Sequence, residues 1–251
     1  MPNQKLDLPT LLAGNPYPGR GIFIGQGQKE KTFFIAYFIM GRSEHSRNRI
    51  FVVEDGELFT RPYDPAKLKD PSLIIYRALS ARPGRIFLTN GDQTDTLLAF
   101  EKEGQSFDQA LMSRSFEPDG PNWTPRISAQ ILWPEGGSQG AAYELSILKA
   151  ADPQGQGCLR QFFHYESHTG VGHFLSTYET DGTPLPSFRG EPRKVAVEDG
   201  GKGAAARFAQ SLWSALDPEN KVSLYVRTLD GAGHFLEEAL INAQETDGKE
   251  Q

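Results

Sequence analysis

TFFIAYFIM, at residues 32–40, is the segment that decides the fold. Its side chains are apolar on both of the faces that alternate along a strand, a pattern typical of a central strand with structure packed on each side. Residues 21–25 form another apolar run, and the polar stretch 26–31 between the two runs contains Gly27, which suits a turn. These residues predict a hairpin at the centre of a sheet that is covered above and below.

Short apolar runs continue outward from this hairpin. The chain holds 26 glycines and 17 prolines, and they lie between these runs, as is typical of many short strands. Asp55-Gly56 predicts a tight hairpin between strands at residues 50–53 and 57–61. Further strands are predicted at residues 85–89 and 222–228. Four more, at residues 127–133, 143–149, 159–165 and 171–178, imply a second sheet.

Three segments predict helices. Apolar residues at helical spacing cover residues 97–112, with an interruption near Gly104. They also cover residues 204–216, where Asp217-Pro218 ends the pattern. A short helix is predicted at residues 235–243.

The expected organisation is a single domain over residues 1–251, because no linker and no internal repeat divides the chain. We expect loosely ordered ends at residues 1–14 and 244–251. Strands, then helices, then strands and a late helix predict an α+β layered fold.

Composition excludes several classes of protein. The 251 residues carry a formal net charge of −6 and their Lys and Arg do not form blocks, so the chain is a poor candidate for capturing long nucleic acid. The single cysteine, Cys158, excludes an internal disulfide and a four-thiolate zinc site, and favours a cytoplasmic setting. The longest apolar run, residues 33–40, is far shorter than the roughly 18 residues that suggest a membrane span. Residues 1–14 contain no apolar stretch typical of a secretion signal.

Two motifs match chemical signatures but favour structural roles. Residues 136–140, GGSQG, have the form of a nucleophile elbow, but Pro134 before them and the strand-like alternation after them favour a glycine-rich turn. His164, His168 and His173 fall within ten positions. The glycines and aromatic residues around them favour strand and turn over the helix face that a metal-binding His pair uses.

An arginine-rich segment follows the central strand directly. Residues 42–49 read RSEHSRNR and hold three arginines. Because a guanidinium suits bidentate capture of phosphate or amide oxygens, a loop of this kind at a strand end is a candidate site for a small phosphate. A solvated loop with surface ion pairs explains the same residues, and the sequence alone leaves both interpretations open.

Six segments with a polar, site-like character occur along the chain. They are Arg42-Ser43 with Asn48-Arg49, Asp70-Pro71 with Tyr76, Thr89-Asn90-Gly91-Asp92-Gln93-Thr94-Asp95, Phe116-Glu117, Thr124-Pro125-Arg126-Ile127 and Ser176-Thr177-Tyr178-Glu179. In this order they resemble the motifs of the archaeal-type inosine monophosphate (IMP) cyclohydrolase family and its bacterial relatives. The resemblance extends from about Tyr17 to Thr228, and the arginine segment and both termini are longer than in the archaeal pattern.

The resemblance implies a fold and a reaction. The implied fold is a four-layer αββα sandwich like that of the N-terminal-nucleophile hydrolases, without autoprocessing, because no Ser, Thr or Cys directly follows Met1. The implied enzyme is a cyclohydrolase of the class that acts on a cyclic amidine C–N bond. It closes 5-formamidoimidazole-4-carboxamide ribotide to IMP with loss of water, the last step of de novo purine biosynthesis, and needs no metal or redox cofactor.

The resemblance also implies partners and leaves alternatives. The expected partner is a small purine nucleotide in the cytoplasm, with no nucleic acid and no membrane, and homo-oligomer formation is left open. A protein on the same scaffold that only binds a purine ribotide is one alternative. An amidohydrolase of another substrate is a second, although it would need an exposed nucleophile that the sequence does not offer.

The residues carried over from the family motifs form the predicted site. Arg49, Tyr76 and Glu117 are the predicted catalytic residues: Tyr76 donates a proton toward the formyl oxygen, Arg49 orients substrate oxygens, and Glu117 accepts a proton from the carboxamide nitrogen. In the longer arginine segment, Arg47 competes with Arg49 for this role and His45 adds a titratable group. The predicted substrate-binding residues are Arg42, Arg47, Asn90, Thr94, Asp95, Thr124 and Arg126.

Overall fold

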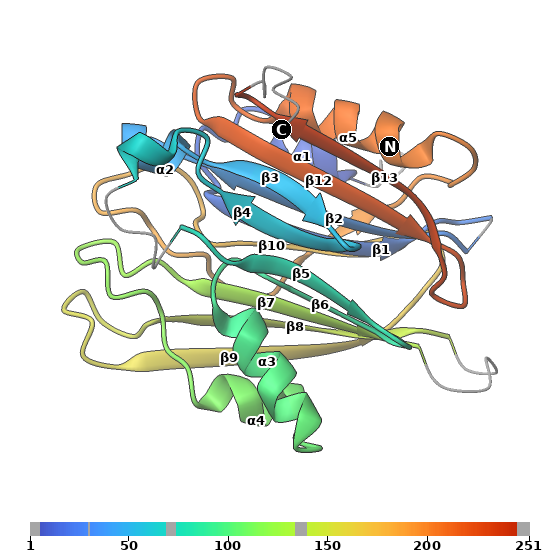
Figure 1. Cartoon of the computed structure of the whole chain (residues 1–251), viewed down its shortest axis with the longest axis horizontal. Coiled ribbons are helices and arrows are strands. Elements are labelled where there is room, and N and C mark those ends of the chain that lie inside the picture. Colours follow the sequence, from blue (N-terminus) through green and yellow to red (C-terminus); the bar gives the residue numbers. More distant parts are fainter. Residues whose placement is uncertain (1–5, 30, 69–73, 134–139, 245–251) are drawn as a thin grey trace, which may run out of the picture.

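The computed structural model describes residues 6–29, 31–68, 74–133 and 140–244. Its strands form two antiparallel sheets that are stacked face to face (Figure 1). The first sheet has the order β11 (Arg193–Ala196), β10 (Val171–Ser176), β1 (Arg20–Gln26), β2 (Phe33–Met40), β12 (Lys221–Leu229) and β13 (Phe235–Asn242). The second has the order β3 (Ile50–Glu54), β4 (Glu57–Arg61), β5 (Arg77–Arg82), β6 (Arg85–Thr89), β7 (Arg126–Leu132), β8 (Ala142–Ala150) and β9 (Cys158–Glu166).

The segment at residues 32–40 forms the centre of the first sheet, as predicted. β2 pairs with β1 on one side and β12 on the other, and all eight of its side chains are buried. The odd-numbered residues 33–39 pack into the core between the two sheets, and the even-numbered residues 34–40 pack against the helices. Burial of each large apolar side chain contributes about 1.5–3 kcal/mol to the free energy of folding, so β2 stabilises both cores.

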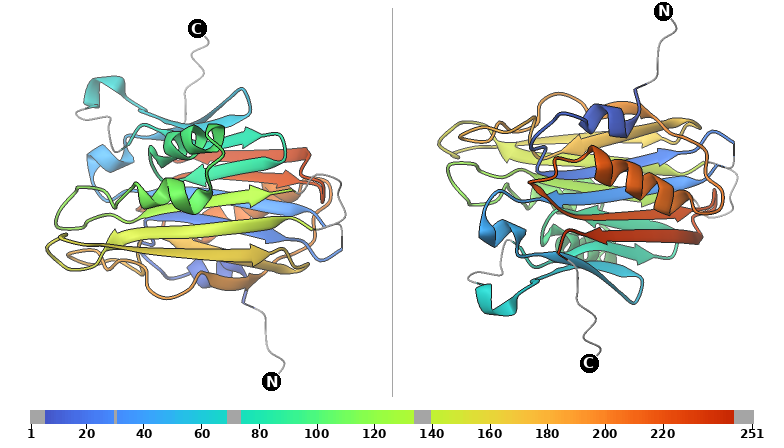
Figure 2. Two further views of the ribbon diagram at one scale, coloured as in Figure 1. Left: turned by 90° about the horizontal axis from the view of Figure 1, so that it is seen from below. Right: turned by 90° about the horizontal axis from the view of Figure 1, so that it is seen from above.

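Helices cover the outer face of each sheet. α1 (Leu8–Leu12) and α5 (Ala204–Ala215) pack on the first sheet, and α3 (Gln93–Lys102) and α4 (Phe107–Met112) pack on the second (Figures 1 and 2). The short helix α2 (Glu44–Arg47) and a 3-10 turn at Pro65–Lys67 lie outside these layers. The chain is therefore an α+β fold with two antiparallel sheets and few helices, which agrees with the predicted sandwich.

Most of the predicted elements are present. The strands predicted at residues 85–89, 127–133 and 143–149 are β6, β7 and β8 with small differences at their ends. The helical region at 97–112 consists of α3 and α4. Gly104, between the two helices, has a φ of 72°, which a residue with a Cβ rarely adopts. The predicted break near this glycine is confirmed.

The helix predicted at residues 235–243 is wrong. Phe235–Asn242 is strand β13, which pairs antiparallel with β12 so that Leu224 lies opposite Ile241. The segment reads FLEEALIN, and its Leu, Glu and Ala residues favour a helix in isolation. Hydrogen bonding to the open side of β12 overrides that local preference.

The loose end predicted for residues 1–14 is wrong for residues 8–12, which form α1. Leu8 and Leu12 are buried in the cluster that includes α5, and Asp7 caps the helix by accepting a 2.8 Å hydrogen bond from the Thr10 amide. Asp70-Pro71 and residues 136–139 lie outside the described residues. None of the helices that the structure describes is long and apolar enough to cross a membrane.

Candidate active site

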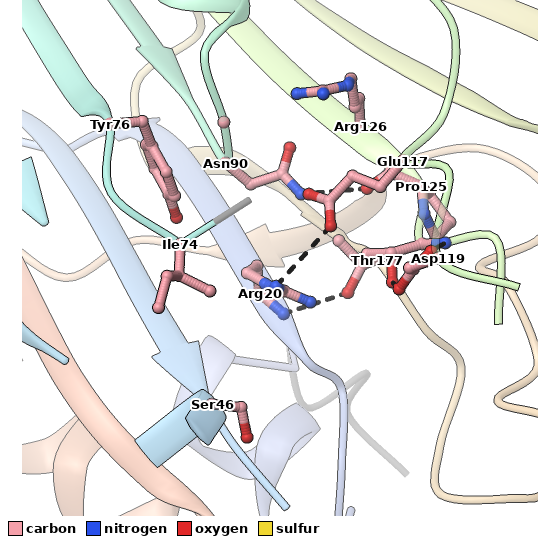
Figure 3. A network of polar contacts seen from close by, with 12 residues as sticks. Arg20, Ser46, Ile74, Tyr76, Asn90, Glu117, Asp119, Pro125, Arg126 and Thr177 are labelled. Carbon is pink, nitrogen blue, oxygen red and sulfur yellow. Dashed lines mark hydrogen bonds and ion pairs between the residues drawn. The ribbon is translucent and has the colours of Figure 1, made fainter. Parts of the chain in front are cut away.

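A buried arginine and a buried glutamate face each other at one end of the sandwich. Arg20 begins β1, and Glu117 lies in the loop between α4 and β7 (Figure 3). The Arg20 Nη2 and Glu117 Oε2 atoms are 4.0 Å apart, and their side chains are 10% and 3% exposed. Arg20 Nε and Glu117 Oε1 have no hydrogen-bond partner among the described residues. Because unsatisfied buried charges are costly, these atoms point to a site that a ligand completes.

The loop that carries Glu117 is closed by its own hydrogen bonds. The Glu117 amide donates to the Thr124 carbonyl at 2.9 Å, and the Thr124 amide donates to Asp119 Oδ1 at 2.6 Å. The Thr124 hydroxyl contacts Asp119 Oδ2 and also lies 2.6 Å from the Tyr178 hydroxyl. These bonds fix the position from which the Glu117 side chain enters the cluster.

Burial raises the pKa of Glu117 to about 7, although the charges of Arg20 and Arg126 lower it. The burial effect outweighs the two arginines because the carboxylate is nearly inaccessible to water. A carboxyl group with a pKa near neutrality exists in both protonation states at physiological pH. It is therefore able to accept and release protons in a reaction.

Two tyrosines meet next to this pair. The Tyr37 and Tyr76 hydroxyls are 2.7 Å apart, with Tyr37 on β2 and Tyr76 directly before β5. Tyr76 is fixed by its backbone, because its amide donates to Thr60 Oγ1 at 2.8 Å and its carbonyl accepts from the Thr60 amide at 2.9 Å. Burial raises the pKa of Tyr76, while the charges of Arg49 and Arg20 lower it.

Arg49 brings a second guanidinium into the same interior. Its side chain is fully buried, Nε donates to the Ser46 carbonyl at 2.8 Å, and Nη2 donates to the Met40 carbonyl at 3.3 Å. Nη1 has no partner among the described residues. The turn that delivers Arg49 is formed by α2, whose first turn is closed by a reciprocal cap between Ser43 and Ser46.

The charges of this cluster do not balance. Burial and the nearby charge of Arg20 lower the pKa of Arg49, but a guanidinium stays charged in proteins. Two buried cations, Arg20 and Arg49, thus meet one carboxyl, Glu117, whose own charge is only partial near neutral pH. A net positive, enclosed site favours an anionic or strongly dipolar ligand.

Asn90 and Arg126 border the cluster on the β7 side (Figure 3). Asn90 Nδ2 donates to the Pro125 carbonyl at 2.9 Å, and its Oδ1 accepts from the Ile127 amide at 2.8 Å. Arg126 donates to Gln93 Oε1 at 2.7 Å and pairs with the Asp92 carboxylate at 2.6 Å. Asn90 therefore holds the backbone on both sides of Arg126 in place.

A family model described as IMP cyclohydrolase-like protein matches residues 17–233. The chain belongs to this family. The matched range contains Arg20, Arg49, Tyr76 and Glu117. A search of curated proteins found no match.

The three catalytic residues predicted from the IMP cyclohydrolase-like motifs lie in one buried cluster. Arg49, Tyr76 and Glu117 come from segments far apart in the chain, and the charge of Arg49 acts on both other groups. Arg47 lies elsewhere, because its Nε donates to the Gly41 carbonyl at 2.9 Å and its Nη2 reaches Asn220 at 3.5 Å. The structure thus places Arg49 in the cluster, and not Arg47.

Five of the seven predicted substrate-binding residues separate into two groups. Asn90, Thr124 and Arg126 border the cluster through the contacts described above. Thr94 and Asp95 make other contacts: the Thr94 hydroxyl lies 2.7 Å from the Thr89 hydroxyl, and the exposed Asp95 carboxylate lies 3.8 Å from Arg77 Nε. These contacts do not join Thr94 or Asp95 to the clustered side chains of Arg20, Arg49, Tyr76 and Glu117.

Arg42 lies at the surface. It pairs with Asp181 at 2.5 Å, and its guanidinium lies over the Tyr17 ring, 5.1 Å from the ring centre. Tyr17 in turn stacks on Tyr178 at 6.0 Å. Arg42 thus forms the surface ion pair of one interpretation, whereas Arg49 enters the interior; the phosphate site of the other interpretation stays a prediction.

Sequence reasoning missed Arg20 and Tyr37. Arg20 is a lone charge at the start of the apolar segment RGIFIG, and Tyr37 is the one hydroxyl in residues 33–40. An isolated polar group in a strand that is apolar on both faces is the signal that could have found them. Thr177, in the last family motif, supports Arg20 because its Oγ1 accepts a 3.1 Å hydrogen bond from the Arg20 amide.

Two of the histidines singled out in the sequence, His164 and His173, have side-chain partners in the structure. Among the described residues, no group of three His, Cys, Asp or Glu side chains could hold a metal ion. His164 contacts Glu144 at 3.2 Å and Asp108 at 3.3 Å. His173 Nδ1 lies 2.6 Å from the Tyr143 hydroxyl, which links β10 of the first sheet to β8 of the second.

Proposed function

We propose that the chain is an IMP cyclohydrolase that closes 5-formamidoimidazole-4-carboxamide ribotide to IMP. In this reaction the carboxamide nitrogen attacks the formyl carbon, and the formyl oxygen leaves as water with one proton from each nitrogen. Membership of the IMP cyclohydrolase-like family supports the substrate. The observation that carries the proposal is the enclosed cluster in which Arg20, Arg49 and Glu117 keep unused hydrogen-bonding atoms beside Tyr76.

Glu117 is the proposed base. An amide nitrogen is a weak nucleophile, so its N–H proton has to be removed as the new bond to the formyl carbon forms. The pKa of about 7 makes Glu117 a stronger base than an exposed carboxylate while leaving it partly ionised at neutral pH. General base catalysis of this kind contributes a factor of about 10²–10⁴.

Tyr76 is the proposed acid. Its hydroxyl proton passes to the formyl oxygen, which would otherwise gather negative charge as the nitrogen attacks. Arg49 and Arg20 lower the free energy of negative charge both on that oxygen and on the phenolate that Tyr76 becomes. When water departs, Glu117 gives the carboxamide proton to the leaving hydroxyl, and the Tyr76 phenolate takes the proton of the former formamide nitrogen. Both side chains thereby return to their starting states, and each nitrogen has lost one proton.

The charge of the cluster also fits the substrate. A ribotide carries a phosphate, and two buried guanidiniums against one carboxyl attract an anion. The four side chains are nearly inaccessible to water, so binding has to displace residues that cover them. The further residues that we propose to hold base, ribose or phosphate are Asn90, Thr124 and Arg126, which border the cluster. Arg42, Arg47, Thr94 and Asp95 make their contacts elsewhere and are not part of this proposal.

The test is turnover by the purified chain, followed as the ultraviolet absorbance of IMP appearing from the formamido ribotide. Glu117→Gln and Tyr76→Phe are each expected to lower turnover by about 10²–10⁴ while IMP still binds. Glu144→Gln is the matched control, because Glu144 is a half-buried carboxyl on β8 whose contacts are His164 and Gln130. Tight ribotide binding without turnover by the native chain would instead identify a non-catalytic binding protein.

We also infer kinship with the sandwich of the N-terminal-nucleophile hydrolases. Two facing antiparallel sheets with helices on their outer faces support it. In the proposed site the reacting groups come from the interior of the chain, at Arg20, Arg49, Tyr76 and Glu117, so the mechanism requires no terminal nucleophile. An experimental structure that superimposes on that sandwich with the same strand connections is the expected result.

A further inference from the structure

Tyr37 places a hydroxyl among the side chains of the core between the two sheets. The residue is fully buried in the middle of β2, and its ring stacks on Phe51 with a centre separation of 5.3 Å. Among the described residues its hydroxyl contacts the Tyr76 hydroxyl, at 2.7 Å. A buried hydroxyl costs free energy unless it is paired, so this pairing is the reason that the position tolerates tyrosine.

The two hydroxyls are not equivalent. Burial raises the pKa of both tyrosines, but for Tyr76 the charges of Arg49 and Arg20 are the next strongest influences and they lower its pKa. The hydrogen bond between the tyrosines lowers the pKa of Tyr76 and raises that of Tyr37. Tyr76 is thus the more acidic of the two, and at 2.7 Å the Tyr37 hydroxyl is close enough to donate to the Tyr76 oxygen.

We infer that Tyr37 is a positioning residue for the proposed reaction: its hydroxyl donates to the Tyr76 oxygen, directs the Tyr76 proton toward the substrate, and stabilises the phenolate that remains. This inference rests on the proposed function of Tyr76. The Tyr76 O–H bond breaks and its proton goes to the formyl oxygen, while the electron pair stays on the Tyr76 oxygen. The Tyr37 O–H bond remains intact throughout.

The first test is the kinetics of Tyr37→Phe, which removes the hydroxyl and keeps the ring. A hydrogen bond to a charged oxygen is lost, so we expect kcat to fall by about 10- to 100-fold with KM changed less than about twofold. Tyr225→Phe is the matched control. Tyr225 lies directly opposite Tyr37 in the pairing of β12 with β2, is equally buried, and bonds to Glu238 and Arg227. Equal losses of kcat in the two variants would overturn the inference.

The second test needs no turnover. Fluorotyrosine is placed at position 76, and its ionisation in the free protein is followed by fluorine NMR with and without Tyr37→Phe. We expect the fluorotyrosine pKa to rise by about one unit or more when the Tyr37 hydroxyl is absent. An unchanged pKa would overturn the inference. If the native chain has no turnover, the proposed function fails, and this titration still decides the role of Tyr37.

Chemical rescue separates positioning from folding. Fluorotyrosine is a stronger acid than tyrosine, so at position 76 it is expected to restore part of the turnover that Tyr37→Phe loses. A loss of rate caused by misplaced packing around Phe51 would not respond to the acidity of the residue at position 76. Absence of any rescue, in a variant that unfolds at the same temperature as the native chain, would assign Tyr37 a structural role only.

Discussion

Removing the charge of Arg20 is expected to raise the pKa of Glu117 above its value of about 7. Arg20→Met keeps most of the side-chain volume and deletes the guanidinium. At the 4.0 Å separation of Nη2 and Oε2, the Coulomb energy is about 4 kcal/mol with an effective dielectric constant near 20. That energy corresponds to an upper limit of about three pKa units, and we expect a shift of at least about one unit after solvent relaxation.

The pH dependence of kcat/KM is the assay. If Glu117 has to be ionised to act as the base, the acidic limb of the profile lies near pH 7 in the native chain. In Arg20→Met the limb moves to higher pH, so activity is lost mainly at pH 7 and is partly recovered at higher pH. Arg114→Met is the control, because Arg114 pairs with Asp92 at 2.5 Å and not with Glu117.

Carboxyl carbon NMR of Glu117 in the free protein reports the same pKa without substrate. An acidic limb that stays in place, or that moves to lower pH, would refute the assignment of Glu117 as the base held ionised by Arg20. A limb that moves while the carboxyl signal does not would show that another group controls the profile.

Three further predictions concern stability and the border of the site. Because burial raises the pKa of Glu117 from 4.5 to about 7, its contribution to stability is present below pH 4.5 and is lost as pH rises to 7. In denaturant unfolding, the free energy of unfolding of Glu117→Gln minus that of the native chain should therefore be about 3 kcal/mol higher at pH 8 than at pH 4. Gly21→Ala places a Cβ 2.3 Å from the Phe38 ring and should lower the free energy of unfolding by about 1–3 kcal/mol in thermal melts; an unchanged melting temperature would contradict this close approach of β1 to Phe38. Asn90→Ala should lower both stability, by about 1–3 kcal/mol, and turnover, whereas Asp95→Asn should leave turnover within about twofold; the reverse ranking in the absorbance assay would contradict the placement of these two residues.

The fold could be read from the sequence where local pattern and tertiary packing agree. In residues 32–40 the apolar alternation on two faces corresponds to two different cores, so the pattern and the packing give the same answer. In Phe235–Asn242 they disagree, because residues with helical preference complete the edge of a sheet. Pairing across the chain, which a single segment does not reveal, decides such cases.

The site could be predicted only in part for a similar reason. Arg49, Tyr76 and Glu117 were accessible because motifs in a fixed order mark them. Arg20 and Tyr37 lie inside strands that look purely structural, and their roles appear only when β1 and β2 bring them beside the loops. The ordered motifs therefore mark loop residues that the fold brings together, whereas residues in strands need the three-dimensional arrangement.

Ring closure itself is the most direct test of the central claim. The formamido ribotide is labelled with carbon-13 at the formyl carbon and mixed with the purified native chain, and carbon NMR follows the label. We predict that the formyl signal disappears and a ring-carbon signal of IMP grows at an enzymatic rate, and that Glu117→Gln and Tyr76→Phe both slow this change strongly. A formyl signal that decays no faster with the native chain than in buffer would contradict the account.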